Sequence, residues 1–329
     1  MINYGKHSIS KEDIVAVADV LQSDHLTGGE KVKEFEQKYA EYCGAKFAVA
    51  LSSGTASLHA AMHVCIEPGD KVIVPAITFI ATANAVKYCG GVPVFADVDP
   101  DTLMVTTETV MRVKDNTTKA VITVDFAGQV CEIENYGCGV ISDSCHSLKH
   151  HGHISCHSFH PVKHMTTGEG GMFVTDIREE ASLVESFRNH GKTIFGNGFG
   201  YNYRMTDFQA ALGISQLERL DSFIKRRQEI AAIYDAEIGD LALKKVSEHT
   251  YHLYVLKVPN RDEFRIKLAE KEIGTQIHYR PLTLTEPYKR PGYCPTAEKV
   301  WKEIVSIPIF PSMTDSEIQQ VIEAVKGAA

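Results

Sequence analysis

The stretch "GVISDSCHSLKHHGHISCHSFHPVKHMTTGEGGMFVTD" (residues 139–176) contains three short apolar runs separated by polar and glycine-rich turns. The runs 139–144, 153–159 and 171–176 have the length of strands and are too short for typical helices. Asp143 lies at the end of the first run, and Lys163 lies between the second run and the glycines. This stretch therefore predicts neighbouring strands with an acid and an amine at their ends.

Four further strand-like runs precede this stretch, at 46–51, 71–75, 92–98 and 119–126. Helical patterns alternate with them, such as "GTASLHAAMHVC" and "FIATANAVKYCG". Alternating strands and helices predict a mainly parallel sheet with helices on its faces. Several of the runs are apolar nearly throughout, which is typical of strands covered on both faces. We therefore expect the α/β class, with a mainly parallel seven-stranded sheet.

The pattern changes near residue 206. Residues 206–238 predict one long helix that links two domains, and they are followed by shorter elements. These are a strand (250–258), a helix (261–273), a strand (275–281) and a terminal helix (314–329). We therefore expect a large α/β domain in residues 1–220 and a small α+β domain in residues 221–329.

The composition excludes several classes of protein. A chain of 329 residues usually forms two domains, and a net charge of -8 disfavours nucleic-acid partners. No apolar run is long enough to span a membrane, and the first residues lack the apolar core of a signal peptide. The eight cysteines show no short paired spacing, which favours reduced thiols. We expect a cytoplasmic protein with neither membrane nor nucleic-acid partners.

The segment "ALSSGTASLHAAM" is a candidate anion site. A strand ends at Leu51, Ser52 and Ser53 can cap a helix, and the helix follows Gly54. Free backbone N–H groups at a helix start attract anions such as phosphate. Gly54 would let the anion approach the backbone closely, and the Thr55 hydroxyl would donate a further hydrogen bond. Taken alone, these residues are more often a plain helix cap.

Asp143 and Lys163 allow two interpretations. Ends of parallel strands meet at one crevice, so the two groups can form a simple ion pair there. They can also be the carboxylate and the Schiff-base lysine of a pyridoxal phosphate site whose phosphate lies at Gly54 and Thr55. In that case the carboxylate keeps the pyridine nitrogen protonated, and Phe79 is a candidate for stacking on the ring. An aromatic residue at a strand end, such as Phe79, is more often ordinary core.

Histidines are frequent in the stretch between the two groups. Imidazole is a common metal ligand, but these spacings match no zinc motif, so we expect no metal site. His146 is of separate interest because it follows Asp143 by three residues. The histidines concerned are His146, His150, His151, His153, His157 and His160.

Seven motifs in order resemble a known family. They are "SSGTASLHAAM", "PAITFIATANAV", "VFADVDPDTL", "VDFAGQ", "ISDSCHSL", "SFHPVKHMTTGEGG" and "GYNYRMTDFQAALGISQLERLD". Together they resemble the DegT/DnrJ/EryC1/StrS family of nucleotide-sugar aminotransferases, which have the type I pyridoxal phosphate fold. The likeness covers nearly the whole chain. "YGKHSISKEDI", "VDFAGQ" and "SFHPVKHMTTGEGG" are similar to the transaminases of pseudaminic acid biosynthesis.

The resemblance implies roles for individual residues. It makes Lys163 the Schiff-base lysine, Asp143 the partner of the pyridine nitrogen and His146 the neighbour of the cofactor O3'. Phe79 would stack on the ring, and Asn202 would reach the phosphate from the other subunit of a homodimer with shared sites. Further cofactor and substrate contacts would be Gly54, Thr55 and Ser158 for the phosphate, and Tyr4, Lys6, Thr27, His278 and Tyr279 for the substrate.

The resemblance also implies a reaction. Glutamate would donate its amino group to C4 of a UDP-linked 2-acetamido-2,6-dideoxy-4-ketohexose, and 2-oxoglutarate would leave. The alternatives are a sugar dehydratase, in which histidine replaces the lysine, a non-catalytic protein on the same fold, and a histidine-rich metal-binding protein.

The sequence departs from the family pattern at two kinds of position. The segments before Asp143 and before Lys163 are short, so we expect little more than a turn between "GQ" and the Asp143 strand. Thr283 stands where similar transaminases commonly carry histidine.

Overall fold

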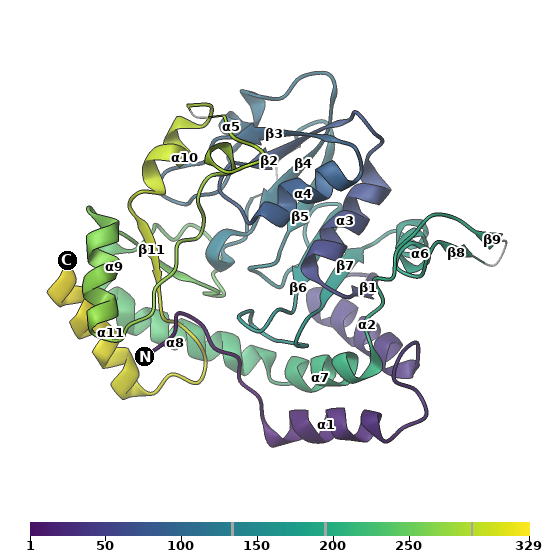
Figure 1. Ribbon diagram of the computed structural model, residues 1–329, viewed down its shortest axis with the longest axis horizontal. Helices are drawn as coiled ribbons and strands as arrows, with labels where there is room; N and C mark the ends of the chain where they lie inside the picture. Colours follow the sequence, from purple (N-terminus) through teal and green to yellow (C-terminus); the bar gives the residue numbers. More distant parts are fainter. Residues whose placement is uncertain (133–134, 194–195, 291) are drawn as a thin grey trace.

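A seven-stranded sheet forms the centre of the computed structural model, which describes residues 1–132, 135–193, 196–290 and 292–329 (Figure 1). The strand order is β1-β7-β6-β5-β4-β2-β3, and only β7 runs antiparallel to its neighbours. This confirms the predicted mainly parallel sheet. The strands are β1 (Phe47–Leu51), β2 (Lys71–Pro75), β3 (Val92–Ala96), β4 (Thr118–Val124), β5 (Gly139–Asp143), β6 (Ile154–Ser158) and β7 (Gly171–Thr175).

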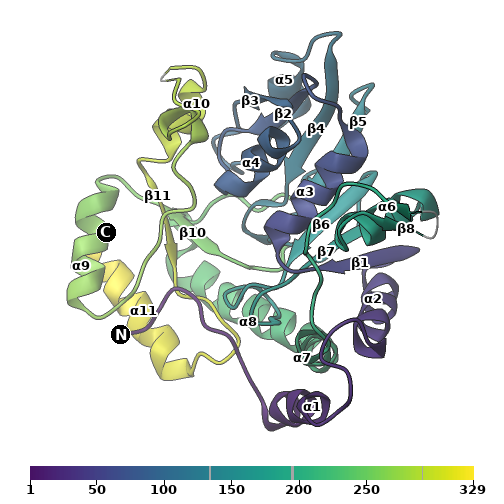
Figure 2. The same ribbon diagram turned by 45° about the vertical axis from the view of Figure 1, so that its right-hand side comes forward.

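Helices cover both faces of this sheet because its strands are apolar on both sides. α3 (Gly54–Cys65) packs on β5, β6 and β7, with α4 (Ile80–Tyr88) and α6 (Arg178–Phe187) beside it. α2 (Glu30–Cys43) packs against β1, and α7 (Asp207–Leu217) lies between α2 and α1 (Lys11–Leu21). Figure 2 shows α1 and α7 beneath the sheet. The short helix α5 (Thr107–Met111) precedes β4.

The glycine-rich turn before β7 brings that strand against the start of α3. A side chain at Gly171 would place its Cβ only 2.3 Å from the carbonyl oxygen of Ser53, the N-cap of α3. Gly171 pairs with Leu51 on one side and with Ser158 on the other. The ends of β1 and β6 and the first turn of α3 are therefore held together by a position that requires glycine.

The connections on either side of β5 are as short as the sequence predicts. Among the described residues between β4 and β5, the only helical segment is the 3-10 turn Phe126–Gly128. Residues 144–153, between β5 and β6, contain neither helix nor strand. Even so, β5 remains in register with both neighbours: Asp143 pairs with Val124 of β4 and with Cys156 of β6.

The predicted single helix over 206–238 is wrong, because it consists of α7 and a separate α8 (Leu220–Ile238). Arg219 leaves the helical region at the junction, with φ -107° and ψ 0°. Its guanidinium there forms an ion pair with the buried carboxylate of Asp13. The apolar periodicity is continuous across the junction, so the pattern alone does not reveal the break.

The strand predicted over 275–281 is also wrong. Only Gln276 pairs there, through reciprocal backbone bonds with Ser306. Ser306 belongs to β11 (Ile304–Ile307), which pairs with β10 (Tyr254–Lys257) and was not predicted. After this bridge the chain leaves the sheet, and Tyr279 lines a cavity instead.

A second core surrounds the β10–β11 pair. It is built from α8, α9 (Arg261–Glu270) and α11 (Asp315–Ala328), and Ile2 joins it by a bridge to Ile273. The division at residue 220 remains a prediction. The remaining short elements are the 3-10 turns Gly239–Leu241 and Leu282–Leu284, the helix α10 (Pro295–Val300) and the pair β8 (Lys192–Thr193) and β9 (Gly196–Asn197), which projects from the body (Figure 1).

The start of α2 depends on a side chain from α7. Gly29, its N-cap, has no side chain, and the carboxylate of Asp207 accepts the N–H groups of Gly29 at 2.8 Å, Lys31 at 3.1 Å and Val32 at 3.4 Å. Asp207 is buried. The carboxylate thus both caps α2 and holds it against α7.

Asp207→Ala is expected to lower the free energy of unfolding by about 1–3 kcal/mol, because it leaves the buried N–H of Val32 and two partly buried N–H groups without their acceptor. Urea unfolding followed by circular dichroism measures this change. The control is Asp24→Ala, at an exposed residue, which should change the free energy by less than about 0.5 kcal/mol. Equal effects of the two substitutions would contradict the role given to Asp207.

Candidate active site

A cavity of about 630 Å³ lies at the carboxyl ends of β4, β5 and β6. Its other walls are formed by the first turn of α3, by residues 276–279 and by His252. This is the edge at which open α/β sheets bind ligands. Most of the predicted site residues line this cavity. They are Tyr4, Gly54, Thr55, Phe79, Asp143, His146, Ser158, Lys163, His278 and Tyr279.

Asp143 is a buried carboxylate without a cation beside it. It is 4% exposed, and among the described residues it forms no ion pair within 4 Å. Thr82 donates its hydroxyl to Oδ2 at 2.7 Å, and the backbone N–H of Cys145 lies 3.3 Å from Oδ1. Burial raises the pKa of Asp143 above its ordinary value, against the lowering effect of these two hydrogen bonds. A ligand with a cationic N–H group would relieve this cost.

Lys163 is a partly buried amine on the wall of the same cavity. It forms no ion pair within the described part of the chain, so the predicted simple ion pair with Asp143 is not present. Desolvation lowers the pKa of the Lys163 amine, although Cys145 and Asp143 oppose the shift. A lowered pKa makes a lysine amine a better nucleophile and base at neutral pH.

The first turn of α3 forms an open cradle for an anion. The Ser53 hydroxyl accepts the N–H of Ala56 at 3.1 Å, whereas the N–H groups of Gly54 and Thr55 have no acceptor among the described residues. Ser158 lies opposite them: a Cβ at Gly54 would come within 2.8 Å of its Cβ. Glycine at this position keeps the cradle open between α3 and β6, as a phosphate site requires.

Aromatic side chains form another wall. Phe79 is 56% exposed at the start of α4, and its ring centroid lies 6.0 Å from that of Tyr279. The hydroxyl of Tyr279 lies 3.0 Å from Nε2 of His146. Because the N–H of Ala127 can only donate to Nδ1 of His146, at 3.3 Å, the ring proton lies on Nε2. His146 therefore donates to Tyr279 and is fixed in one tautomer.

His252 is a site residue that the sequence analysis missed. It is buried on the cavity wall, and its Nε2 lies 3.5 Å from Nζ of Lys163. It lies in a strand-like run 89 positions away from Lys163, where a histidine is indistinguishable from an ordinary core residue. Only the packing of the C-terminal part of the chain against the sheet reveals it.

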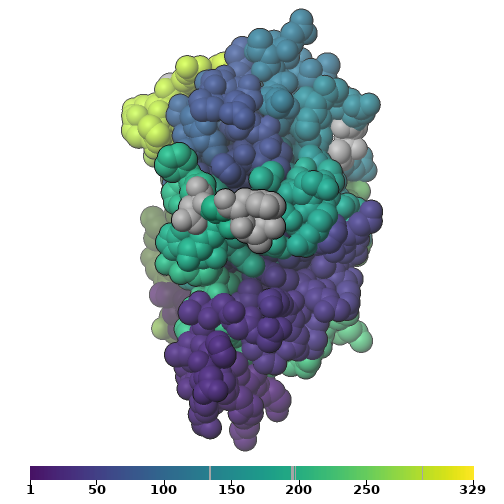
Figure 3. All heavy atoms as spheres, turned by 90° about the vertical axis from the view of Figure 1, so that its right-hand side faces the viewer, coloured from purple at the N-terminus to yellow at the C-terminus, as the bar shows by residue number. Residues whose placement is uncertain are grey.

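Three predicted site residues lie outside this cavity. Lys6 lies near a much smaller void behind Lys163, Thr27 pairs with Thr206, and Asn202 pairs with Asn189 near the projecting β8–β9 segment. Figure 3 shows the face that carries this segment, between α1 and α2 (purple) and the sheet helices (blue). Thr283, which stands where similar transaminases commonly carry histidine, is buried and donates its hydroxyl to Glu298 at 3.0 Å.

The histidines of the central stretch do not converge. His151 contacts Asp125, His153 contacts Glu180, and His157 packs on Tyr39. His164, next to Lys163, turns its Nε2 to the carbonyl oxygen of Thr250 at 3.2 Å. Within the described ranges, no group of three or more His, Cys, Asp or Glu side chains is arranged to hold a metal ion.

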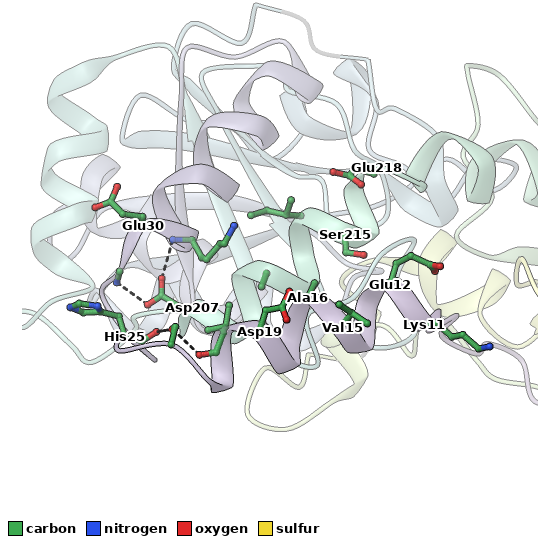
Figure 4. Close-up of a pocket in the computed structure, with 16 residues that line it drawn as sticks. Lys11, Glu12, Val15, Ala16, Asp19, His25, Glu30, Asp207, Ser215 and Glu218 are labelled. Atoms are coloured by element: carbon green, nitrogen blue, oxygen red, sulfur yellow. Dashed lines mark hydrogen bonds between the residues drawn. The ribbon is translucent and has the colours of Figure 1, made fainter.

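A second cavity of about 690 Å³ lies between α1, the start of α2 and α7, away from the residues described above. Figure 4 shows Glu12, Val15 and Asp19 of α1 beside it, with Asp207 and Ser215 of α7 opposite. Asp207 is already occupied there by the backbone of α2. The other charged residues that line this cavity are exposed. Among the described residues, its lining therefore lacks a buried carboxylate left for a ligand, which the first cavity has in Asp143.

The model of the DegT/DnrJ/EryC1/StrS aminotransferase family matches residues 7–326 of the chain. The spore coat polysaccharide biosynthesis protein SpsC of Bacillus subtilis is 36% identical over 372 aligned residues, covering 98% of this chain and 96% of that protein. This alignment is longer than the chain itself, in keeping with its shortened segments. No helix in the described residues is long and apolar enough to cross a membrane.

Solved structures share the fold over nearly the whole length. PseC of Helicobacter pylori, an aminotransferase of pseudaminic acid biosynthesis, is 27% identical with a TM-score of 0.93 over 99% of this chain and 98% of that chain. The sugar aminotransferase Spr1654 of Streptococcus pneumoniae, solved in its PMP form, is 28% identical with a TM-score of 0.93 over 99% and 97%. The same protein has been solved in a PLP form.

Gly54→Ala is expected to weaken the binding of pyridoxal phosphate by about 10-fold or more, because the new methyl group must displace Ser158 or the start of α3. Absorbance or fluorescence titration of the cofactor-free protein measures the dissociation constant. The matched control is Gly139→Ala, where the nearest atom to a Cβ lies at 3.8 Å. Unchanged binding in the Gly54 variant would rule out the cradle as the phosphate site.

Proposed function

Because this chain belongs to the DegT/DnrJ/EryC1/StrS family of pyridoxal phosphate-dependent sugar aminotransferases, we propose that it transfers the amino group of glutamate to a nucleotide-linked keto-sugar. The observation that carries this proposal is that one cavity is lined by both a lysine amine and a buried carboxylate. Neither group has an ion-pair partner among the described residues. The anion cradle at Gly54 and Thr55 opens on the same cavity.

The residues present fit the cofactor. Asp143 would hold the protonated pyridine nitrogen, because its carboxylate is buried and lacks a cation. Gly54, Thr55 and Ser158 would hold the phosphate, and the exposed ring of Phe79 would cover one face of the pyridine. When bound, pyridoxal phosphate supplies an aldehyde that reacts with amines and a ring that withdraws electrons.

Lys163 would act as the base and the acid of the reaction. With its pKa lowered by desolvation, the free Nζ takes the proton from the α-carbon of glutamate. In the second half-reaction the same group delivers a proton to the sugar carbon that receives the nitrogen. His146 stays neutral because burial lowers its pKa well below the ordinary value. It therefore holds Tyr279 by a neutral hydrogen bond at the cavity wall.

The preferred substrate is a UDP-linked 2-acetamido-2,6-dideoxy-4-ketohexose, aminated at C4. The likeness to PseC of the pseudaminic acid pathway, together with the polysaccharide role in the name of SpsC, supports this choice. Tyr4, His278 and Tyr279 line the cavity and would contact the sugar. Lys6 and Thr27 remain proposed substrate contacts outside it.

We further propose a cytoplasmic homodimer with shared sites. Asn202 does not line the cavity of its own chain and lies beside the projecting β8–β9 segment, so it would serve the partner's phosphate. The eight cysteines, all free, suit a reducing compartment. We also propose that residues 1–220 and 221–329 are the two domains.

Lys163→Ala is expected to abolish both the visible absorbance of the bound cofactor and transamination, because the amine that anchors the cofactor and moves the proton is lost. The spectrum of the purified protein and the formation of 2-oxoglutarate from glutamate measure the two effects. Lys149→Ala, at a lysine on the surface, should leave both unchanged. An unaltered spectrum and rate in the Lys163 variant would refute the proposed function.

The substrate itself is tested with a panel of UDP-, GDP- and dTDP-linked 4-keto and 3-keto sugars supplied with glutamate. Mass spectrometry of the amino product should show the highest rate for the UDP-linked 4-keto-2-acetamido sugar. A preference for another nucleotide, or for a 3-keto sugar, would contradict the substrate while leaving the aminotransferase class intact.

A further inference from the structure

We infer that His252 is a positioning residue that accepts a hydrogen bond from the amine of Lys163 and holds it where it exchanges protons with substrate. This inference rests on the proposed function of Lys163. It starts from the 3.5 Å separation between Nε2 of His252 and Nζ of Lys163, both on the cavity wall. The distance is at the outer limit of a hydrogen bond, as is common in catalytic sites that tighten when substrate binds.

No other hydrogen bond explains the burial of this imidazole. His252 is 4% exposed, and within the described part of the chain its Nδ1 has no hydrogen-bond partner. Its only side-chain hydrogen bond there is the one to Lys163. Because buried polar rings are costly without partners, a ring with a single polar contact at a reactive amine indicates a role toward that amine.

The backbone on both sides of His252 is firmly held. Arg227 of α8, itself buried, donates through Nη1 to the carbonyl oxygens of Tyr251 at 3.0 Å, His252 at 3.3 Å and Ile309 at 2.8 Å. The N–H of Leu253 donates to the carbonyl oxygen of Ala127 at 3.1 Å, and the N–H of the same Ala127 fixes His146. The position of the His252 ring is therefore set by the docking of the C-terminal part of the chain on the sheet.

The imidazole remains neutral and therefore keeps a lone pair for the amine. Burial lowers the pKa of His252 well below its ordinary value, and the nearby amine of Lys163 adds to the effect. A neutral imidazole can accept an N–H of Lys163 at Nε2. The other titratable or charged groups that act on this pair are Asp143, Cys145, His146, His164, Arg227 and His278.

An acceptor at this position has a defined consequence for the reaction. It binds an N–H of Lys163 and leaves the amine lone pair directed at the substrate carbon. When Lys163 has taken the proton, the same contact stabilises the ammonium form. Removing the acceptor should therefore lower the pKa of Lys163 further and make it a weaker base.

His252→Phe, which keeps the ring volume, and His252→Gln, whose side-chain oxygen can reach the position of Nε2, form the matched pair. The Phe variant should slow the glutamate half-reaction about 10- to 100-fold, as expected for a lost hydrogen bond to a charged group. The acid limb of its pH–rate profile should move to lower pH by about one unit. The Gln variant should stay close to the unmodified enzyme in both respects.

A second readout does not depend on catalysis. Trace acetylation of the cofactor-free full-length protein at a series of pH values, followed by mass spectrometry of the Lys163 peptide, gives the titration midpoint of that amine. The midpoint should fall in the Phe variant and be restored in the Gln variant. Should the Phe variant fail to fold, His252→Asn replaces it, because its shorter amide cannot reach the position of Nε2.

Equal midpoints and equal rates in all forms would overturn the inference. Slow Phe and Gln variants with an unshifted midpoint would also overturn it, since that result shows a structural role alone. Either result leaves the proposed function standing as long as Lys163→Ala remains inactive and without visible absorbance. Failure of the proposed function is thus distinguished by the Lys163 variant and not by the His252 variants.

Discussion

The constraint on which the site depends is the carboxylate of Asp143, buried at the end of β5 without a cation. Such a group costs free energy unless a positive partner compensates it, and in this chain the hydroxyl of Thr82 and one backbone N–H only reduce the cost. A ligand with a cationic nitrogen would remove the remaining cost by pairing with this carboxylate, and that gain would contribute to its binding free energy. In the proposed function a protonated pyridine would supply that nitrogen, and Gly54 and Thr55 on the same cavity would hold the phosphate.

The short connections around β5 do not disturb this arrangement, because strand register rather than the loops places the reactive groups. β5 is paired on both sides up to Asp143, and β6 is paired with β7 up to Ser158. Lys163 follows only five positions later, on a turn closed by the hydrogen bond from its own N–H to His160 at 2.8 Å. The short segment 144–153 therefore leaves this strand register intact, and the register positions the acid and the amine.

The sequence predicts well whatever local pattern determines. Seven apolar runs located all seven strands of the sheet, because buried parallel strands have a distinctive composition. Asp143, Lys163 and Gly54 were identified because each follows or ends a strand at the binding edge. The break at Arg219 and the loss of strand pairing after Gln276 were missed, since distant partners, Asp13 and β11, decide them. His252 was missed for the same reason: its partner is 89 residues away.

The site is therefore a joint product of the sheet and of the C-terminal part of the chain. The sheet supplies the carboxylate, the amine and the cradle, while segment 250–253 supplies the imidazole beside the amine. Gly128 makes this contact possible: at a φ of +108° it has no side chain, and a Cβ there would lie 2.5 Å from the hydroxyl of Thr250. The hydrogen bonds of Thr250 to the carbonyl oxygens of Gly128 and His146, both at 3.2 Å, then tie the segment to the wall that carries His146. Any movement between the two parts must stretch these bonds together with the contact between Lys163 and His252, so the environment of the amine is coupled to the docking of the C-terminal part.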